Sequence, residues 1–331
     1  EKINSRPVQP SGSTVVPVRE SAFDTVLGHS RGLQQVIQLA RKVAVTDVPV
    51  LLTGETGTGK EVFAQAIHNG SARAKQPFVA INCSAFSKEL LESEIFGHKA
   101  GAFTGALKDK KGLFEEANHG TIFLDEIGEM AYGLQAKLLR VLETGEYIKV
   151  GDTKPTKIDV RIVSATNRNL KEEIANSNFR EDLYFRLSVF HLHLPPLRER
   201  REDIPELAAA FLKFFAAKMG KQVKGFAADC QAWMQSYAWP GNVRELRNVI
   251  ERALIICDDY ITLDDMPLDF RSSTLSGSAA DGDDFELAEA EHRHIQRVLQ
   301  YTKGNKAEAA RLLKIGLTTL YRKIEEYGIN I

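Results

Sequence analysis

The stretch VPVLLTGETGTGKEVFAQAIH, residues 48–68, decides the fold of this chain. It begins as a short apolar run, which is typical of a buried parallel strand, and continues as an amphipathic helix. The glycine-rich turn between them lets backbone N–H groups surround a phosphate, and Lys60 would reach the β and γ phosphates of a nucleotide. The sequence therefore predicts a P-loop. Its nucleotide-binding residues would be Gly54, Glu55, Thr56, Gly57, Thr58, Gly59, Lys60 and Glu61.

The same strand and helix pattern repeats on both sides of this stretch. Apolar runs typical of buried strands lie at 48–54, 78–83, 120–126 and 160–167, with amphipathic helical stretches at 61–68, 88–96 and 134–142. Strands that alternate with helices predict an α/β fold with a parallel sheet. After Pro195 and Pro196 the strand signal disappears, and three helical stretches between 202 and 257 predict a second, all-α subdomain.

Two carboxylates follow the apolar run TIFL at the end of a predicted strand. Ligands of open α/β sheets lie at this edge, so Asp125 would hold Mg²⁺ through water and Glu126 would polarise the attacking water. Glu61 stands where Ser or Thr usually touches the Mg²⁺ of a P-loop enzyme. Together with the P-loop, these carboxylates make ATP hydrolysis the leading activity, with ATP and Mg²⁺ as the ligands.

Polar residues also end the two neighbouring strands. Asn82 could hydrogen-bond Glu126 and hold this base away from water, and Thr166 and Asn167 would lie near a γ-phosphate. An asparagine or threonine at a strand end is about as often an ordinary turn residue. From the residues alone, both interpretations stay open.

The composition is that of a globular protein, with 331 residues, 43% of them hydrophobic and 26% charged. The formal net charge of −1 argues against nucleic-acid binding only if the charges are evenly spread. They are not, because residues 258–286 hold nine acids and one base, whereas residues 303–323 hold six bases and one acid. The neutral total therefore conceals an acidic segment beside a basic one.

The basic segment has the pattern of a helix-turn-helix. An alanine-rich helical stretch (305–313), a short turn and an amphipathic stretch (317–328) follow one another. Ala309 and Ala310 are small where the helices would cross, although a helical hairpin with solvated charges is the simpler alternative. The residues expected to contact DNA are Lys306, Thr318, Thr319, Tyr321, Arg322 and Lys323. The preceding helix, 286–301, would supply a dimer face, which suits a palindromic site, through Leu287, Ile295, Val298 and Leu299.

Cysteine usage and hydropathy indicate the cellular compartment of the protein. Cys83, Cys230 and Cys257 lie far apart without a C-x-x-C pair, which favours buried, reduced thiols in a cytoplasmic protein. No apolar run approaches the ~18 residues that would cross a bilayer, so no membrane partner is expected. The predicted segments are a linker over 1–21, an α/β subdomain over 22–197, an α-helical subdomain over 198–271, a flexible linker over 272–284 and a helix-turn-helix domain over 285–331.

Six stretches resemble the AAA+ activators of sigma-54 RNA polymerase, the bacterial enhancer-binding proteins related to the nitrogen regulator. They are GETGTGKE (54–61), ESEIFGHKAGAFTGA (92–106), GTIFLDEIGEM (120–130), FREDLYFRL (179–187), LPPLRERREDIPEL (194–207) and WPGNVREL (239–246). The resemblance covers about residues 23–331, and Glu61 matches the P-loop of that family. It implies an AAA+ P-loop NTPase fold with a parallel sheet, an all-α lid subdomain and a C-terminal Fis-type helix-turn-helix domain.

The resemblance also implies roles for single residues. The loop that touches sigma-54 would be Gly101, Ala102, Phe103, Thr104, Gly105 and Ala106. Arg180 and Arg186 would be arginine fingers that reach the ATP of a neighbouring subunit, although a surface salt bridge from Arg180 to Glu181 or Asp182 is the simpler interpretation. Arg244 would be the second nucleotide sensor, Asn82 the glutamate switch and Thr166 the first sensor. The segment beside the adenine would include Val26, Leu27 and Gly28.

These features predict an ATP-dependent activator that binds enhancer DNA and remodels the closed complex of the sigma-54 RNA polymerase holoenzyme into an open one. By resemblance, dimers would assemble into a hexameric ring. The chain opens on Glu1 rather than Met, and the linker would suit a two-component response regulator without its receiver domain, although a ligand-sensing domain upstream fits as well. The alternative is a DNA-binding regulator whose ATPase domain binds ATP without productive hydrolysis. The sigma-54 loop and the helix-turn-helix disfavour a AAA+ helicase, clamp loader or unfoldase.

Overall fold

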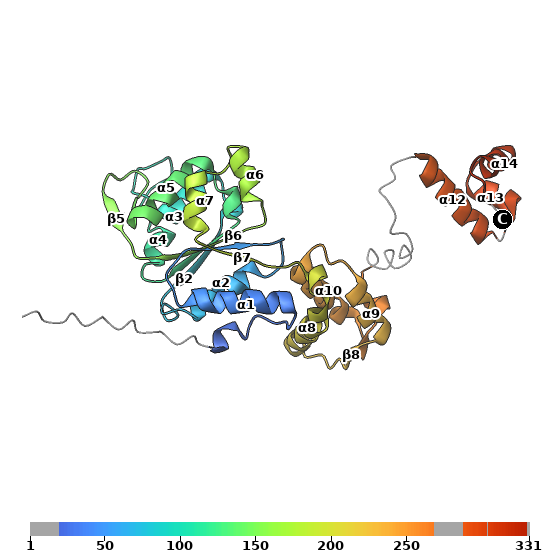
Figure 1. Ribbon diagram of the computed structural model, residues 1–331, viewed down its shortest axis with the longest axis horizontal. Helices are drawn as coiled ribbons and strands as arrows, with labels where there is room; N and C mark the ends of the chain where they lie inside the picture. The colour runs from blue at the N-terminus through green and yellow to red at the C-terminus, as the bar shows by residue number, and fades with distance from the viewer. Residues whose placement is uncertain (1–19, 268–286, 303, 330–331) are drawn as a thin grey trace, which may run out of the picture. The chain divides into compact units, whose positions relative to one another are not determined.

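The computed structural model describes residues 20–267, 287–302 and 304–329. Contacts divide the chain into two compact units, Glu1–Arg271 and Ser272–Ile331, and each is described by itself. Figure 1 shows the elements of both units. Among the helices that the described residues form, none is long and apolar enough to cross a membrane.

A five-stranded parallel sheet forms the centre of the first unit, in the order β2-β3-β6-β1-β7. The strands are β1 (Val50–Thr53), β2 (Phe78–Asn82), β3 (Thr121–Asp125), β6 (Arg161–Thr166) and β7 (Phe190–His193). The predicted parallel α/β fold and its four strands are confirmed. The edge strand β7 was not predicted, because its apolar residues alternate with histidines and it runs directly into the two prolines.

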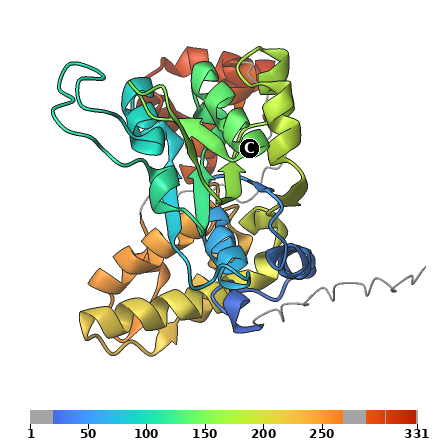
Figure 2. The same ribbon diagram turned by 90° about the vertical axis from the view of Figure 1, so that its left-hand side faces the viewer.

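Helices cover both faces of this sheet (Figures 1 and 2). The strands alternate their side chains, so that Leu51 packs with α3, α5 and α7, whereas Val50 and Leu52 pack with α1 and α2. The helices are α1 (Arg31–Ala44), α2 (Lys60–Asn69), α3 (Lys88–Phe96), α4 (Leu113–Glu116), α5 (Tyr132–Thr144), α6 (Leu170–Ala175) and α7 (Glu181–Leu187). A small antiparallel pair, β4 (Glu146–Ile148) and β5 (Pro155–Lys157), follows α5.

A helical subdomain, residues 197–267 and called the lid below, packs around Trp239, which is fully buried and donates from its Nε1 to the Met234 carbonyl oxygen at 2.7 Å. Its helices are α8 (Ile204–Met219), α9 (Ala228–Ser236) and α10 (Asn242–Ile256). The prediction of an all-α subdomain is wrong in one detail. Two two-residue strands, β8 (Gly225–Phe226) and β9 (Tyr260–Ile261), pair in parallel, and runs this short leave no periodic signal.

The second unit contains α12 (Leu287–Tyr301), α13 (Lys306–Leu312) and α14 (Leu317–Glu326), and the predicted helix-turn-helix is confirmed. Ala309 and Ala310 are buried where α13 crosses its neighbours, as expected. The predicted dimer face is wrong for Ile295 and Leu299, which are 2% and 3% exposed in the core of their own unit. Val298 packs partly against this core, and the side chain of Leu287 lies outside the described residues.

The three cysteines are buried and unpaired, as the sequence predicts. Burial raises the pKa of the Cys83 and Cys230 thiols to about 12. For Cys83, the charges of Asp125 and Glu126 at the end of β3 contribute to this rise in pKa after burial. These thiols therefore remain protonated at neutral pH and belong to the core.

Candidate functional site

The P-loop lies between β1 and α2, and its lysine is buried. Lys60 is 6% exposed, and its Nζ donates to the carbonyl oxygens of Gly54 at 2.8 Å and Glu55 at 3.2 Å. Burial lowers the pKa of Lys60, and the negative charges of Asp125 and Glu126 oppose this shift. An ammonium group held by carbonyl oxygens alone is available to an anionic ligand that offers stronger acceptors.

The two predicted carboxylates end β3 at the same edge of the sheet. Asp125 Oδ1 accepts a hydrogen bond from the Glu126 backbone N–H at 3.0 Å, and Glu126 has a left-handed φ of 50°. This turn separates the directions of the two side chains, so each can do different work. In the described residues no cluster of three or more metal-ligating side chains is present.

The polar ends of β2 and β6 are arranged differently from the expectation. Asn82 Oδ1 accepts from the Ser84 backbone N–H at 2.8 Å and from Ser84 Oγ at 2.7 Å, and among the described residues it makes no hydrogen bond to Glu126. The predicted Asn82–Glu126 hydrogen bond is therefore wrong for this state, because Asn82 caps the short helix Cys83–Ala85 that follows β2.

At the end of β6, Asn167 hydrogen-bonds the P-loop, whereas the hydroxyl of Thr166 bonds the chain that follows β6. Asn167 donates from Nδ2 to Thr56 Oγ1 at 3.0 Å and from its backbone N–H to Glu126 Oε2 at 3.4 Å. Thr166 is fully buried, and its Oγ1 accepts from the Arg168 backbone N–H at 3.1 Å. The sequence predicts that both residues end a strand, but only the structure shows that their hydrogen-bond partners differ.

The lid contacts the P-loop directly. The Val243 backbone N–H donates to the Gly57 carbonyl at 3.0 Å, and Arg200 donates to the Thr58 carbonyl at 2.8 Å. A Cβ on Gly57, whose φ is 81°, would lie 2.3 Å from the Gly241 carbonyl oxygen and 3.0 Å from Arg244 Cβ. Arg244 therefore begins its side chain beside the P-loop, as the resemblance implies, and only glycine permits this approach.

Three further polar residues of the lid reach the P-loop, and sequence reasoning missed them. Arg198 forms a bidentate ion pair with Glu55, Asn242 donates to Glu55 and Thr56, and Arg200 is 4% exposed. Burial lowers the pKa of Arg200. A signal existed, since Arg198 and Arg200 fall in LPPLRERREDIPEL and Asn242 in WPGNVREL, two stretches that carry the family resemblance.

The segment around Gly28 joins the α/β part to the lid. Asp203 is fully buried and accepts at 2.7 Å from the backbone N–H groups of His29 and Ser30 and from Ser30 Oγ. A Cβ on Gly28, at a φ of 130°, would lie 2.7 Å from the Asp203 carboxyl carbon. Val26 packs against the core on the α1 and α2 side and Leu27 against the lid core, so the segment spans the junction between them.

The two predicted arginine fingers lie at the two ends of α7. Arg180 donates to both carboxylate oxygens of Asp182, at 3.0 and 2.7 Å, and stands over the Tyr132 ring at 5.6 Å. Arg186 is 59% exposed, and its Nη2 lies 3.6 Å from Glu143 Oε1. Within one copy of the chain, each guanidinium therefore has a local ion pair near the surface.

The predicted sigma-54 loop lies between α3 and α4 and projects from the rest of its unit (Figure 2). Hydrogen bonds from Gly101 to the Ala106 carbonyl at 2.8 Å and from Ala106 to the Phe103 carbonyl at 3.0 Å close its tip. Phe103 is 43% exposed, and its ring centroid lies 4.9 Å from that of His98. Leu107, which sequence reasoning missed, is 90% exposed directly beside this tip.

In the second unit, the exposed face of α14 carries Thr318, Tyr321 and Arg322, and Lys306 Nζ stands 5.1 Å over the Tyr321 ring. Thr319 is half-buried. The expectation that Lys323 lies on this outer face is wrong. Its side chain is 17% exposed, and Nζ donates to Glu291 Oε2 at 2.9 Å and to Tyr327 Oη at 3.1 Å.

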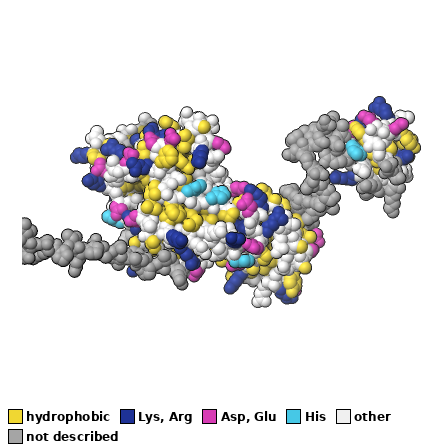
Figure 3. All heavy atoms as spheres, viewed as in Figure 1, with side chains coloured by type: hydrophobic (Ala, Val, Ile, Leu, Met, Phe, Trp, Pro, Cys, Tyr) yellow, Lys and Arg dark blue, Asp and Glu magenta, His cyan; other side chains and the backbone are white. Residues whose placement is uncertain are grey.

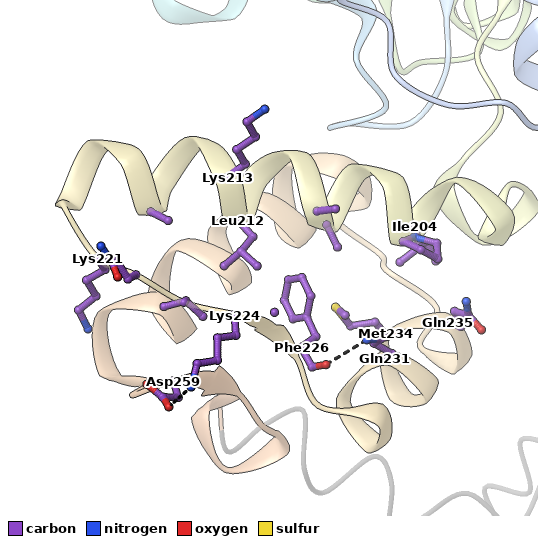
Figure 4. Close-up of a pocket in the computed structure, with 17 residues that line it drawn as sticks. Ile204, Leu212, Lys213, Lys221, Lys224, Phe226, Gln231, Met234, Gln235 and Asp259 are labelled. Atoms are coloured by element: carbon purple, nitrogen blue, oxygen red, sulfur yellow. Dashed lines mark hydrogen bonds and ion pairs between the residues drawn. The ribbon is translucent and has the colours of Figure 1, made fainter.

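Two cavities accompany these features. One, of about 330 Å³, adjoins the P-loop, and Thr53 Oγ1 lies there 2.7 Å from His191 Nε2 and 3.1 Å from His193 Nδ1. Burial lowers the pKa of His191. The other, of about 840 Å³, lies in the lid between α8 and α9, and its lining includes no residue of the P-loop or β3 (Figure 4).

Acidic and basic side chains are interspersed over the face shown in Figure 3.

The chain matches three protein families in succession. Residues 26–193 match the Sigma-54 interaction domain, residues 198–282 the AAA+ ATPase lid domain, and residues 286–327 the bacterial regulatory proteins of the Fis family. These matches include the P-loop, the lid and the helix-turn-helix described above.

Relatives of known name align over nearly the whole chain. The alginate biosynthesis transcriptional regulatory protein AlgB of Pseudomonas aeruginosa is 47% identical over 92% of this chain and 68% of its own length. The DNA-binding transcriptional regulator NtrC of Escherichia coli is 41% identical over 92% of this chain and 70% of its own length. A crystal structure of NtrX from Brucella abortus in complex with ATP is 36% identical, covers 92% of this chain and 70% of that one, and superimposes with a TM-score of 0.71. The chain therefore belongs to the sigma-54-dependent transcriptional regulators and combines their AAA+ domain and lid with a Fis-type helix-turn-helix.

Proposed function

We propose that this activator hydrolyses ATP and uses the energy to convert a closed sigma-54 promoter complex into an open one. The observation that carries the proposal is the buried Lys60 ammonium, which in the part of the chain that the structure describes donates to carbonyl oxygens while the Glu126 and Asp125 charges act on it. A phosphate chain is the ligand that suits this arrangement. The relative NtrX, which has been solved with ATP and with ADP, supports the same choice.

The residues at the edge of the sheet would divide the chemistry between them. Glu126 would orient and polarise the attacking water, and Lys60 would leave its carbonyl partners for the β and γ phosphates. Asp125, through water, would hold a Mg²⁺ that neutralises phosphate charge when it is bound. Asn82 would act as the glutamate switch and Thr166 as the first sensor. Asn167 would also sense the nucleotide, because its contacts link Thr56 of the P-loop to Glu126.

Catalysis would depend on assembly. Arg180 and Arg186 would exchange their local ion pairs for the γ-phosphate bound by the next subunit, where a guanidinium suits the charge of the transition state. An exposed arginine in a single copy is what such a role requires. By family resemblance the closed assembly would be a hexamer.

The loop between α3 and α4 and the helix α14 would each contact a partner. The loop from Gly101 to Ala106 would press Phe103 and Thr104 on sigma-54, while α14 would read a palindromic enhancer through Thr318, Tyr321 and Arg322 in the two copies of a dimer. Lys306 would also contact DNA. Both partners, DNA and RNA polymerase, are cytoplasmic in bacteria, so the proposal places the protein there too.

The proposal is tested by ATP turnover per subunit, measured over a wide range of protein concentration. Turnover should rise with concentration and then level off, because each site needs residues of a second copy. A regulator that binds ATP without productive hydrolysis would give no turnover at any concentration, and this result would replace the proposal with that alternative.

Arg186→Ala should lower ATP turnover about tenfold in the fully assembled protein, since Arg180 remains to supply part of the positive charge. Glu143→Gln is the matched control, because it breaks the same local ion pair and leaves the guanidinium in place. Its turnover should equal that of the wild type. Equal losses in the two variants would mean that the local ion pair, rather than a contact in trans, is what matters.

A further inference from the structure

A carboxylate stands inside the P-loop, where an anionic nucleotide is proposed to bind. Glu55 follows Gly54, and the backbone carbonyls of these two residues hold the Lys60 ammonium. If the Glu55 side chain were free, it could turn toward Lys60, repel the phosphates and compete with them for this lysine. Nucleotide binding therefore requires that the negative charge be kept away from the loop.

Arg198, near the start of the lid, holds this carboxylate. Its Nη1 donates to Glu55 Oε2 and its Nη2 to Glu55 Oε1, both at 2.7 Å, in the bidentate geometry that orients two planar groups. The pKa of Glu55 lies below its ordinary value, chiefly because of the Arg198 hydrogen bonds and then because of Asn242. The side chain is therefore charged at neutral pH, and its direction matters for an anionic ligand.

Asn242 fixes the carboxylate to the interior of the lid. Its Nδ2 donates to Glu55 Oε2 and to the Thr56 carbonyl, both at 3.1 Å, and its Oδ1 accepts from the Leu197 backbone N–H at 2.7 Å. Asn242 is fully buried and has a φ of 53°, a left-handed conformation that asparagine adopts more readily than most residues. One amide thus joins the P-loop to the chain just before Arg198.

The charges around Lys60 agree with this placement. Those that shift its pKa belong to Glu126, Asp125 and Arg244, and the Glu55 carboxylate is not among them. The backbone carbonyl of Glu55 nevertheless lies 3.2 Å from Lys60 Nζ. The Glu55 carboxylate bonds Arg198 and Asn242 instead, so the backbone of Glu55 contacts Lys60 while its side chain contacts the lid.

We propose that Arg198 is a positioning residue of the nucleotide site, which holds the Glu55 carboxylate against the lid and leaves Lys60 to the phosphates. This inference rests on the proposed function, since it assumes that a nucleotide binds the P-loop. It gives the lid a direct part in nucleotide affinity. A movement that separates Arg198 from Glu55 would return a negative charge to the phosphate position and weaken binding.

The test compares the affinity of the wild type and its variants for ADP with Mg²⁺, by isothermal titration calorimetry. Arg198→Ala should bind about tenfold more weakly than the wild type, which is the scale expected of one uncompensated charge a few ångströms away. Glu55→Gln removes the charge that Arg198 holds, and its affinity is the reference for the double variant. The double variant R198A/E55Q should bind ADP within about twofold of Glu55→Gln, because Arg198 then has no charge to position.

The double variant lacks the same Arg198 contacts as R198A. If it binds ADP more tightly than R198A does, the weak binding of R198A comes from the misplaced Glu55 charge and not from a folding defect. Arg201→Ala is the matched control and should bind normally, since the Arg201 side chain is exposed and, among the residues described, makes no hydrogen bond or ion pair. Wild-type affinity in R198A, or a double variant as weak as R198A, overturns this inference alone. A wild type that binds no nucleotide overturns the proposed function and this inference with it.

Discussion

Lys60→Ala is expected to reduce ATP turnover by roughly 100-fold or more, to the limit of detection. The Lys60 ammonium is buried, and its hydrogen bonds among the described residues go to the carbonyl oxygens of Gly54 and Glu55. Phosphates would replace these carbonyls as acceptors, so the variant loses a charge-assisted contact in the bound state and in the transition state. Steady-state turnover at saturating protein concentration is the measurement.

Lys60→Met separates the charge from the packing, because it keeps an apolar side chain of similar length in the buried position. It should lose as much turnover as Lys60→Ala. Lys75→Ala, an exposed lysine in the same unit, should leave turnover within about twofold of the wild type. Normal turnover in Lys60→Met would show that the ammonium group is dispensable and would remove the central argument for the ATP site.

Much of the α/β core could be predicted because its information is local. Strands β1, β2, β3 and β6 are apolar runs that end in a polar residue or in glycine, and the P-loop adds a turn that few other structures need. The edge strand β7 lacks that signal, because its residues have a partly exposed face and alternate with His191 and His193. Only pairing with β1 identifies it as a strand.

The contacts of the lid could not be predicted in the same way, because they join residues that are far apart in the sequence. Arg198 and Glu55 are separated by 143 positions, and Asn242 and Glu55 by 187. Neither pair follows from any period or propensity. Lys323 illustrates the same limit in the second unit. Its position beside Arg322 on α14 predicts an outward-facing side chain. Instead, its ion pair with Glu291 directs its ammonium toward α12.

The largest separation of two activities is expected for Phe103→Ala, which should abolish open-complex formation and leave ATP turnover within about twofold of the wild type. The ring is 43% exposed, and its recorded ring contact is with His98 in the same loop. At Gly101 and Gly105, both with positive φ, a Cβ would meet no atom within 4 Å, so the loop tip is open to a partner. Removing the ring would therefore delete the proposed partner contact without disturbing the P-loop.

Phe214→Ala is the matched control, since this phenylalanine of α8 is 57% exposed and lies in the lid rather than on the loop. Both variants lose a similar exposed ring, so a general effect of lost apolar surface would appear in both. Permanganate reactivity of the promoter measures opening, and phosphate release measures turnover in the same mixture. If Phe103→Ala still opens the promoter, the loop is not the element that transmits force. If both opening and turnover fail together, Phe103 supports the assembly of the ATPase rather than its contact with sigma-54.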